Sequence, residues 1–202
     1  MSRTANGFDP EEFEKLCGKL GAKGIIEEVE IRYDGPVYFN KIREAIKTDR
    51  RGEVVFAVIR PNGKIITVAS PEYPRGIFRI PTGGLGHGED ILEAVCRETK
   101  EELGLEAEII GFAGVIKIRF LWGNEEEMFY SYLFLLRETG GKLLEDATDD
   151  EVSEVKEVGR EGLHDIAAAL AGIEGEWRDW GRFRHVTTDA IYRALKEEGS
   201  QI

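Results

Sequence analysis

PTGGLGHGEDILEAVCRETKEELGL, residues 81–105, is the stretch around which the rest of the chain is organised. Its first part contains four glycines, Gly83, Gly84, Gly86 and Gly88. Glycine has no side chain and readily adopts positive φ, so we expect a loop without regular structure whose backbone can approach a ligand closely. Gly83 and Gly84 are therefore candidate substrate-binding positions.

A helix is predicted from Asp90 to Leu103, because apolar residues recur there at helical spacing. The expected buried stripe consists of Leu92, Val95, Cys96, Thr99 and Leu103. The Asp90 side chain can cap the first turn, and Gly104 stands where a left-handed residue commonly ends a helix.

Three glutamates of this helix, Glu98, Glu101 and Glu102, fall on one face because they are three and four residues apart. Like charges at this spacing repel, so the face needs a counter-charge. A hard divalent cation is a natural candidate, since Mg²⁺ prefers carboxylate and water oxygens and bridges to substrate phosphates. The alternative is an ordinary solvated acidic face, and the glycines directly before the helix favour the cation.

The spacing Gly83, five residues, Glu89, seven residues and then RETKEELGL (97–105) resembles the Nudix box in every fixed polar and glycine position. Thr99 stands where that pattern has an aliphatic residue. Because threonine is β-branched and close to valine in shape, we expect a packing adjustment there and no loss of chemistry.

The resemblance implies an α/β fold, a Nudix-like α/β/α sandwich with a mixed sheet, preceded by a short α/β N-terminal extension. It implies that Glu98, Glu101, Glu102 and the Gly83 carbonyl bind Mg²⁺, with Mn²⁺ as a possible substitute. Arg97 and Glu89 are expected to pair and fix the loop to the helix. A further glutamate beyond the box often binds metal or acts as the base, and Glu151 and Glu154 are the candidates; an acidic solvated loop is the alternative.

The implied activity is magnesium-dependent hydrolysis of a diphosphate linkage in a nucleoside diphosphate joined to another moiety, by attack of a metal-activated water. The proton acceptor stays open among the glutamates named above. The alternative function is a regulatory domain that binds a nucleotide or nucleotide-sugar without turnover. Isomerisation of an isoprenoid diphosphate is less favoured, because neither cysteine is evidently placed for it. The substrate fingerprints sought beyond the box, an SQPWPFP-like array or a proline about sixteen residues downstream, are absent.

Two arginines precede the glycines, and Arg75 and Arg79 could meet substrate phosphates with their guanidinium groups or simply lie on the surface. Near the C-terminus, Trp177, Trp180 and Phe183 could stack on a base, or pin a helix to the core. His87 is the only histidine placed to touch a substrate, and loop exposure is its alternative.

The composition indicates a globular protein of 202 residues, with a net charge of −12 that disfavours nucleic acid backbones and anionic membranes. We expect an extension over residues 1–50, packed on a hydrolase domain over 51–202. The extension could support a homodimer or add a layer to the fold. Two cysteines without disulfide or metal spacing, and the lack of a signal or membrane segment, favour the cytoplasm.

Helices are predicted over 9–20, 40–47, 163–170 and 188–197, the last capped by Thr188. Strands are predicted over 25–33, 53–60, 64–69, 77–81, 107–120 and 127–136, and the second and third of these form a hairpin around Pro61-Asn62-Gly63.

Overall fold

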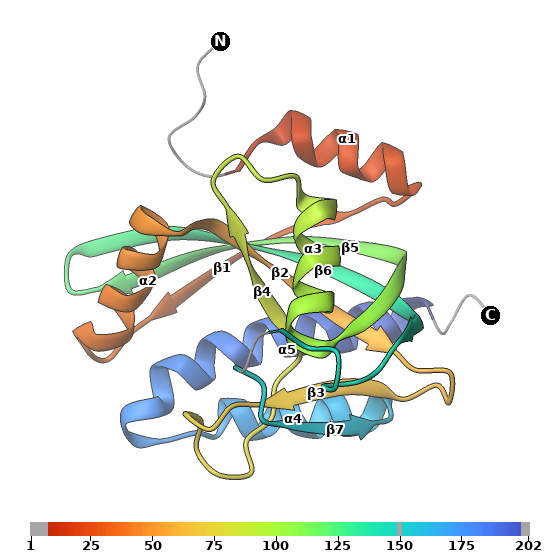
Figure 1. Cartoon of the computed structure of the whole chain (residues 1–202). Coiled ribbons are helices and arrows are strands. Elements are labelled where there is room, and N and C mark those ends of the chain that lie inside the picture. The colour runs from red at the N-terminus through yellow and green to blue at the C-terminus, as the bar shows by residue number, and fades with distance from the viewer. Residues whose placement is uncertain (1–7, 149–150, 199–202) are drawn as a thin grey trace.

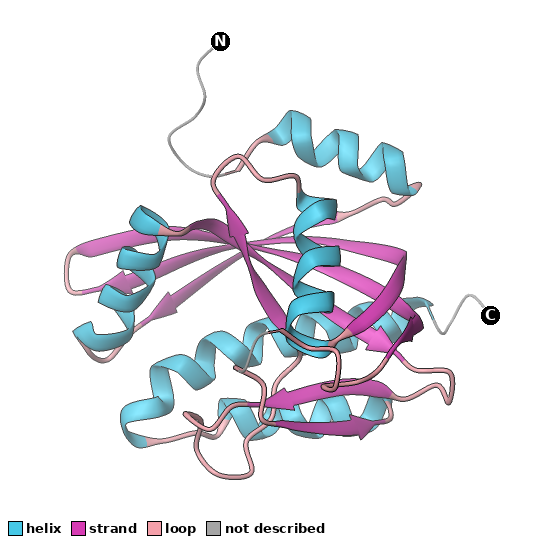
Figure 2. Ribbon diagram, in the orientation of Figure 1, coloured by secondary structure: helices cyan, strands magenta, loops and turns pink. Residues whose placement is uncertain are grey.

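The computed structural model describes residues 8–148 and 151–198, which form a mixed seven-stranded sheet with helices on both faces (Figures 1 and 2). The strands are β1 (Ile25–Arg32), β2 (Arg50–Ile59), β3 (Ile65–Ala69), β4 (Thr82–Gly86), β5 (Leu105–Trp122), β6 (Glu125–Gly141) and β7 (Glu154–Val158). The helices are α1 (Pro10–Leu20), α2 (Pro36–Thr48), α3 (Ile91–Leu103), α4 (Arg160–Ala171) and α5 (Arg178–Glu198), with a short 3₁₀ turn, η1 (Gly175–Trp177).

The strand order is β1-β5-β6-β2-β3-β7, and β4 pairs with β2 beside β3. The pairs β1/β5 and β6/β2 are parallel, whereas β5/β6, β2/β3, β2/β4 and β3/β7 are antiparallel. The mixed α/β sandwich expected from the sequence is therefore confirmed.

Two cores lie on opposite faces of the sheet, because successive side chains of a strand point to opposite sides. In β2, Val54 and Phe56 face α1 and α3, whereas Val55 and Ala57 face α2, α4 and α5. β6 is buried on both faces from Phe129 to Leu136, as a central strand should be. None of the described helices is long and apolar enough to cross a membrane.

The N-terminal residues contribute to the same sheet and to both cores. β1 pairs in parallel with β5, in register from Ile25 opposite Gly114 to Arg32 opposite Leu121. α1 buries Phe13, Leu16 and Cys17 in one core, and α2 buries Phe39 in the other. Residues 8–48 are thus packed on the rest of the fold, while a domain boundary at residue 50 stays a prediction.

The glycine-rich stretch was expected to lack regular structure, and this expectation is wrong for residues 82–86, which form β4. Its backbone pairs with β2, with Gly83 opposite Val54 and Gly84 opposite Glu53. Backbone pairing needs no side chain, so glycine can take part where a neighbouring strand holds it. Conversely, residues 77–81 form only an isolated bridge between Arg79 and Val68 and not the expected strand.

Two details of the predicted helices also need correction. Cys96 is exposed and Leu92 is half-buried, because the buried side of α3 is centred on Ile91, Ala94, Val95, Glu98, Thr99, Glu102 and Leu103. Thr188 is not a cap but a fully buried residue inside α5. α5 begins ten residues earlier because Trp180 and Phe183 continue its buried stripe, so these rings pin the helix to the core.

Candidate active site

The β4–α3 junction places the residues of the box, and both predicted ends of the helix are confirmed. The Asp90 side chain accepts hydrogen bonds from the backbone N–H groups of Leu92 (2.8 Å) and Glu93 (3.2 Å). Gly104 has φ of +71° and ends the helix in the left-handed region. Inside the helix, the buried Thr99 hydroxyl donates to the Val95 carbonyl (2.7 Å), so the unusual threonine is satisfied locally.

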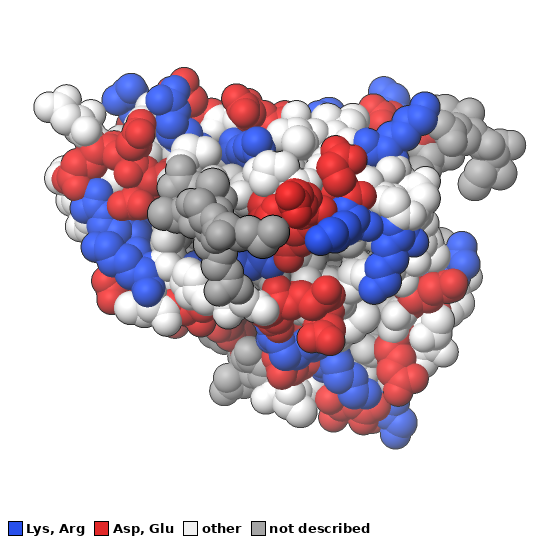
Figure 3. All heavy atoms as spheres, turned by 90° about the horizontal axis from the view of Figure 1, so that it is seen from above, with Lys and Arg blue, Asp and Glu red and all other residues white. Residues whose placement is uncertain are grey.

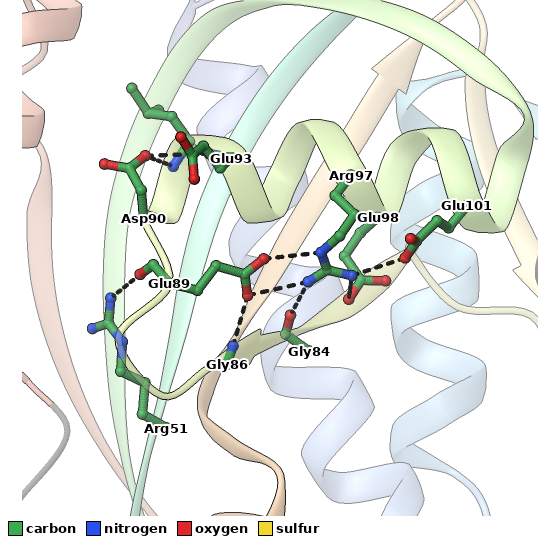
Figure 4. Close-up of polar contacts among 10 residues, drawn as sticks. Arg51, Gly84, Gly86, Glu89, Asp90, Glu93, Arg97, Glu98 and Glu101 are labelled. Carbon is green, nitrogen blue, oxygen red and sulfur yellow. Dashed lines mark hydrogen bonds and ion pairs between the residues drawn. The ribbon is translucent and has the colours of Figure 1, made fainter.

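Arg97 lies at the centre of a network that joins strand, loop and helix (Figure 4). Its Nε donates to Glu89 Oε1 (2.9 Å), and its Nη2 donates to the Gly84 carbonyl (3.0 Å) and to Glu89 Oε2 (3.1 Å). Its Nη1 donates to Glu98 Oε1 and Glu101 Oε2, both at 2.9 Å. Glu89 Oε2 also accepts from the Gly86 N–H (2.8 Å). The structure thus brings together the predicted Arg97–Glu89 pair and two of the three predicted metal ligands.

The carboxylates of this network differ in how they are stabilised. Burial raises the pKa of Glu89, but hydrogen bonds from Arg97 and the Gly86 N–H outweigh it, so the Glu89 pKa is lowered overall. Burial also raises the pKa of Glu98, Arg97 offsets this only in part, and the charge of Glu101 raises it further. An added cation would therefore favour the charged form of Glu98, whose pKa is raised.

Glu98 and Glu102 are 8% and 3% exposed, whereas the Glu101 side chain is 42% exposed. Glu98 lies directly against the Gly83 backbone, where a Cβ would collide with its Cγ and carboxylate. Glu102 lies on the inner side near the buried Arg79. Burial lowers the pKa of Arg79, but nearby Tyr73 and Glu102 raise it overall.

The donor set fits a hard divalent cation, because it consists of carboxylate oxygens and two of the carboxylates already converge on one positive group, Nη1 of Arg97. Within residues 8–148 and 151–198, however, no three His, Cys, Asp or Glu side chains stand close enough to hold a metal as they are. In this arrangement both Glu98 and Glu101 accept hydrogen bonds from Arg97.

The other predicted residues lie around this network. Glu151 is exposed just before β7, and Glu154 is the exposed first residue of β7. The chain shortly before them approaches α3, where the Thr148 N–H donates to the Glu101 carbonyl (2.9 Å). Asp149 and Asp150, part of the same acidic run, lie outside the described residues. His87 is exposed, with Nε2 3.0 Å from the Ile46 carbonyl oxygen.

Arg75 is exposed in the turn before β4, whereas Arg79 is buried. The Arg79 guanidinium donates to the Tyr73 hydroxyl (2.8 Å), the Ile80 carbonyl (2.9 Å) and the Thr82 hydroxyl (3.0 Å). Direct contact of either arginine with a substrate stays a prediction. For Arg79, these hydrogen bonds favour a structural role in supporting the start of β4.

Sequence reasoning missed two charged residues near the site, Arg50 and Glu53. Arg50 lies over Gly84, whose added Cβ would be 3.0–3.3 Å from the guanidinium, and its charge lowers the pKa of Glu98. Glu53 is buried and accepts from the Ser131 hydroxyl and from Arg184 Nη1, both at 2.8 Å. The sequence did hold one signal of a buried charge: Glu53 directly precedes the apolar run VVFAVI of β2.

The NUDIX domain family matches residues 49–180, well over half of the chain. The chain belongs to the Nudix family. The resemblance carried by the box is thereby confirmed, and with it the assignment as a Nudix-type pyrophosphohydrolase.

Several solved structures are similar to this Nudix protein. An ADP-ribose pyrophosphatase from Streptococcus suis is 15% identical over 71% of this chain and 90% of its own, with a TM-score of 0.43. An Ap4A hydrolase from C. elegans is 16% identical over 74% and 99%, with a TM-score of 0.46. A MutT Nudix hydrolase from Burkholderia pseudomallei is 22% identical over 54% and 82%, with a TM-score of 0.43. None of these values assigns a substrate to this chain.

Proposed function

We propose that the protein hydrolyses a diphosphate linkage in a nucleoside diphosphate joined to another moiety, in a reaction that depends on Mg²⁺. One observation carries the proposal: the carboxylates of Glu98 and Glu101 converge on a single positive group, Nη1 of Arg97, and Glu98 lies against the Gly83 backbone. A face that gathers carboxylates in this way suits a divalent cation and, through it, the phosphates of a substrate.

Glu98, Glu101, Glu102 and the Gly83 carbonyl would hold the cation, Mg²⁺ or in its place Mn²⁺. The bound cation supplies neutralisation of charge on the phosphoryl oxygens and a lower pKa for a bound water. Arg97 and Glu89 hold α3 and β4 together, and so fix the directions in which the carboxylates point. Arg50 and Gly84, which lie side by side, are suited to contact substrate phosphate oxygens, and Arg75, exposed in the turn before β4, is a further candidate.

The proton released by the attacking water is taken by a glutamate of the site: Glu98, Glu101, Glu102, Glu151 or Glu154. A general base works best when its pKa lies near the operating pH, and burial moves Glu98 in that direction. Single Glu→Gln variants, each examined by its pH–kcat profile, distinguish the five: only loss of the base removes the acidic limb.

The proposal is tested by phosphate or nucleoside monophosphate release on a panel: ADP-ribose, NADH, dinucleoside polyphosphates, nucleoside triphosphates and nucleotide-sugars. Turnover is expected with Mg²⁺ or Mn²⁺, to stop on chelation and to return when the metal is restored. Glu101→Gln and Glu102→Gln should lower kcat by about 100-fold or more. The matched control is Glu93→Gln, an exposed glutamate in the first turn of the same helix, which should keep wild-type kcat.

Two results would contradict the proposal. If Glu101→Gln and Glu102→Gln fold normally and keep full metal-dependent turnover, the carboxylates do not hold the metal. If the wild type binds a panel member tightly but turns over none, the protein is a nucleotide sensor.

A further inference from the structure

Arg51, the second residue of β2, joins the N-terminal helix to the loop of the box. Its Nη1 and Nη2 donate to the two carboxylate oxygens of Glu12 on α1, each at 2.8 Å. Its Nη2 also donates to the backbone carbonyl of Glu89 (2.9 Å), the contact drawn at the left of Figure 4. The guanidinium therefore holds a helix that lies outside the matched family range and a loop that lies inside it.

The contact continues without a gap to the metal-binding face. Arg51 binds the backbone carbonyl of Glu89. The carboxylate of the same Glu89 binds Arg97 and the Gly86 N–H. Arg97 in turn binds Glu98 and Glu101. Every step is a charge-assisted or backbone hydrogen bond between 2.8 and 2.9 Å, so an unbroken chain of such bonds links the Arg51 guanidinium to the carboxylates.

Glu12 is not the sole attachment of α1, because that helix also buries Phe13, Leu16 and Cys17 against the sheet. What Glu12 provides is orientation. The Arg51 side chain is only 12% exposed, and a bidentate carboxylate restricts the orientation of its guanidinium plane. Burial alone would lower the pKa of Arg51, and the hydrogen bonds and charge of Glu12 raise it overall, so the group stays charged.

We propose that Glu12 is a positioning residue of the active site: by orienting Arg51, it fixes the Glu89 carbonyl and hence the loop that carries Arg97 and its carboxylates. The helix α1 then contributes to the active site through Glu12. Its effect on turnover rests on the proposed hydrolase function, whereas its effect on the loop does not.

The test compares Glu12→Gln with Glu14→Gln, which removes the same charge from an exposed position two residues further along the same helix. Removing an outer-shell partner of a metal ligand costs about 10- to 100-fold, so for a residue further out we expect kcat to fall about threefold to tenfold. KM should change less than twofold. Amide hydrogen exchange over residues 82–90 of the metal-free protein should become faster in Glu12→Gln and stay at the wild-type rate in Glu14→Gln.

A double variant separates positioning from simple attachment. Arg51→Met should itself slow turnover and loosen residues 82–90, and adding Glu12→Gln to it should change neither any further. The proposal is overturned if Glu12→Gln keeps wild-type kcat and wild-type exchange. It is also overturned if its loss follows only a lower unfolding temperature and persists in the Arg51→Met background. Should the wild type hydrolyse nothing, the proposed function fails, and the exchange rates still decide the role of Glu12.

Discussion

Gly83→Ala is the substitution that tests the geometry of the site most directly. Gly83 lies in β4 with an ordinary negative φ, so alanine is compatible with its backbone. Its added Cβ, however, would collide with the Cγ and carboxylate of Glu98. Ordinary van der Waals contact begins at 3.4 Å. The carboxylate must therefore withdraw by about 1 Å, and a misplacement of that size costs on the order of 100-fold in rate.

The assay is metal-dependent turnover of the best panel substrate, measured together with the free energy of unfolding in urea. We expect kcat/KM to fall by about 100-fold, with overpacking costing about 1–3 kcal/mol of stability. Gly159→Ala is the matched control, because it also adds one methyl group at negative φ and meets no atom within 4 Å. If Gly83→Ala folds and keeps the kcat/KM and magnesium requirement of the wild type, Glu98 does not lie against Gly83 in the working enzyme.

Two further predictions concern stability. Arg184→Met should destabilise the fold by about 3–5 kcal/mol, seen by urea unfolding, because it leaves the buried Glu53 carboxylate without its cation; a loss below 1 kcal/mol would contradict the pairing. Glu89→Gln should lower the unfolding temperature at pH 7, and this difference should shrink as the pH falls below the ordinary carboxyl value of 4.5. The sign follows because Arg97 and Gly86 lower the folded-state pKa of Glu89, so its contribution is lost when it is protonated; a constant difference would argue against it.

The placement of the box residues could be predicted from the sequence because these residues are close in the chain. Glu98, Glu101 and Glu102 share a face by helical spacing alone, and Asp90 and Gly104 mark the ends of the helix by local backbone preference. The Arg97–Glu89 pair spans only eight residues, so strand, loop and helix bring it together wherever the rest of the chain goes.

What the sequence could not provide depends on distant partners. Gly83 and Gly84 form a strand only because β2 pairs with them, and glycine has no side chain from which that pairing could be predicted. Arg51 and Glu12 are 39 residues apart, and Arg184 reaches Glu53 across 131 residues. Such contacts are set by the topology of the sheet and by the helices on it, which local patterns do not determine.

The same contacts explain why a bound cation is central to the proposed reaction. Four of the arginines around the box are Arg50, Arg51, Arg79 and Arg97. Each has acidic neighbours: Arg50 pairs with Asp49, Arg51 with Glu12, Arg97 with three glutamates, and Arg79 lies near Glu102. Acidic and basic side chains are likewise interleaved on the surface drawn in Figure 3. In a chain of net charge −12, these arginines shape the site but bring little net positive charge to it. We infer that the charge needed to attract a diphosphate comes from the metal that these carboxylates are proposed to hold.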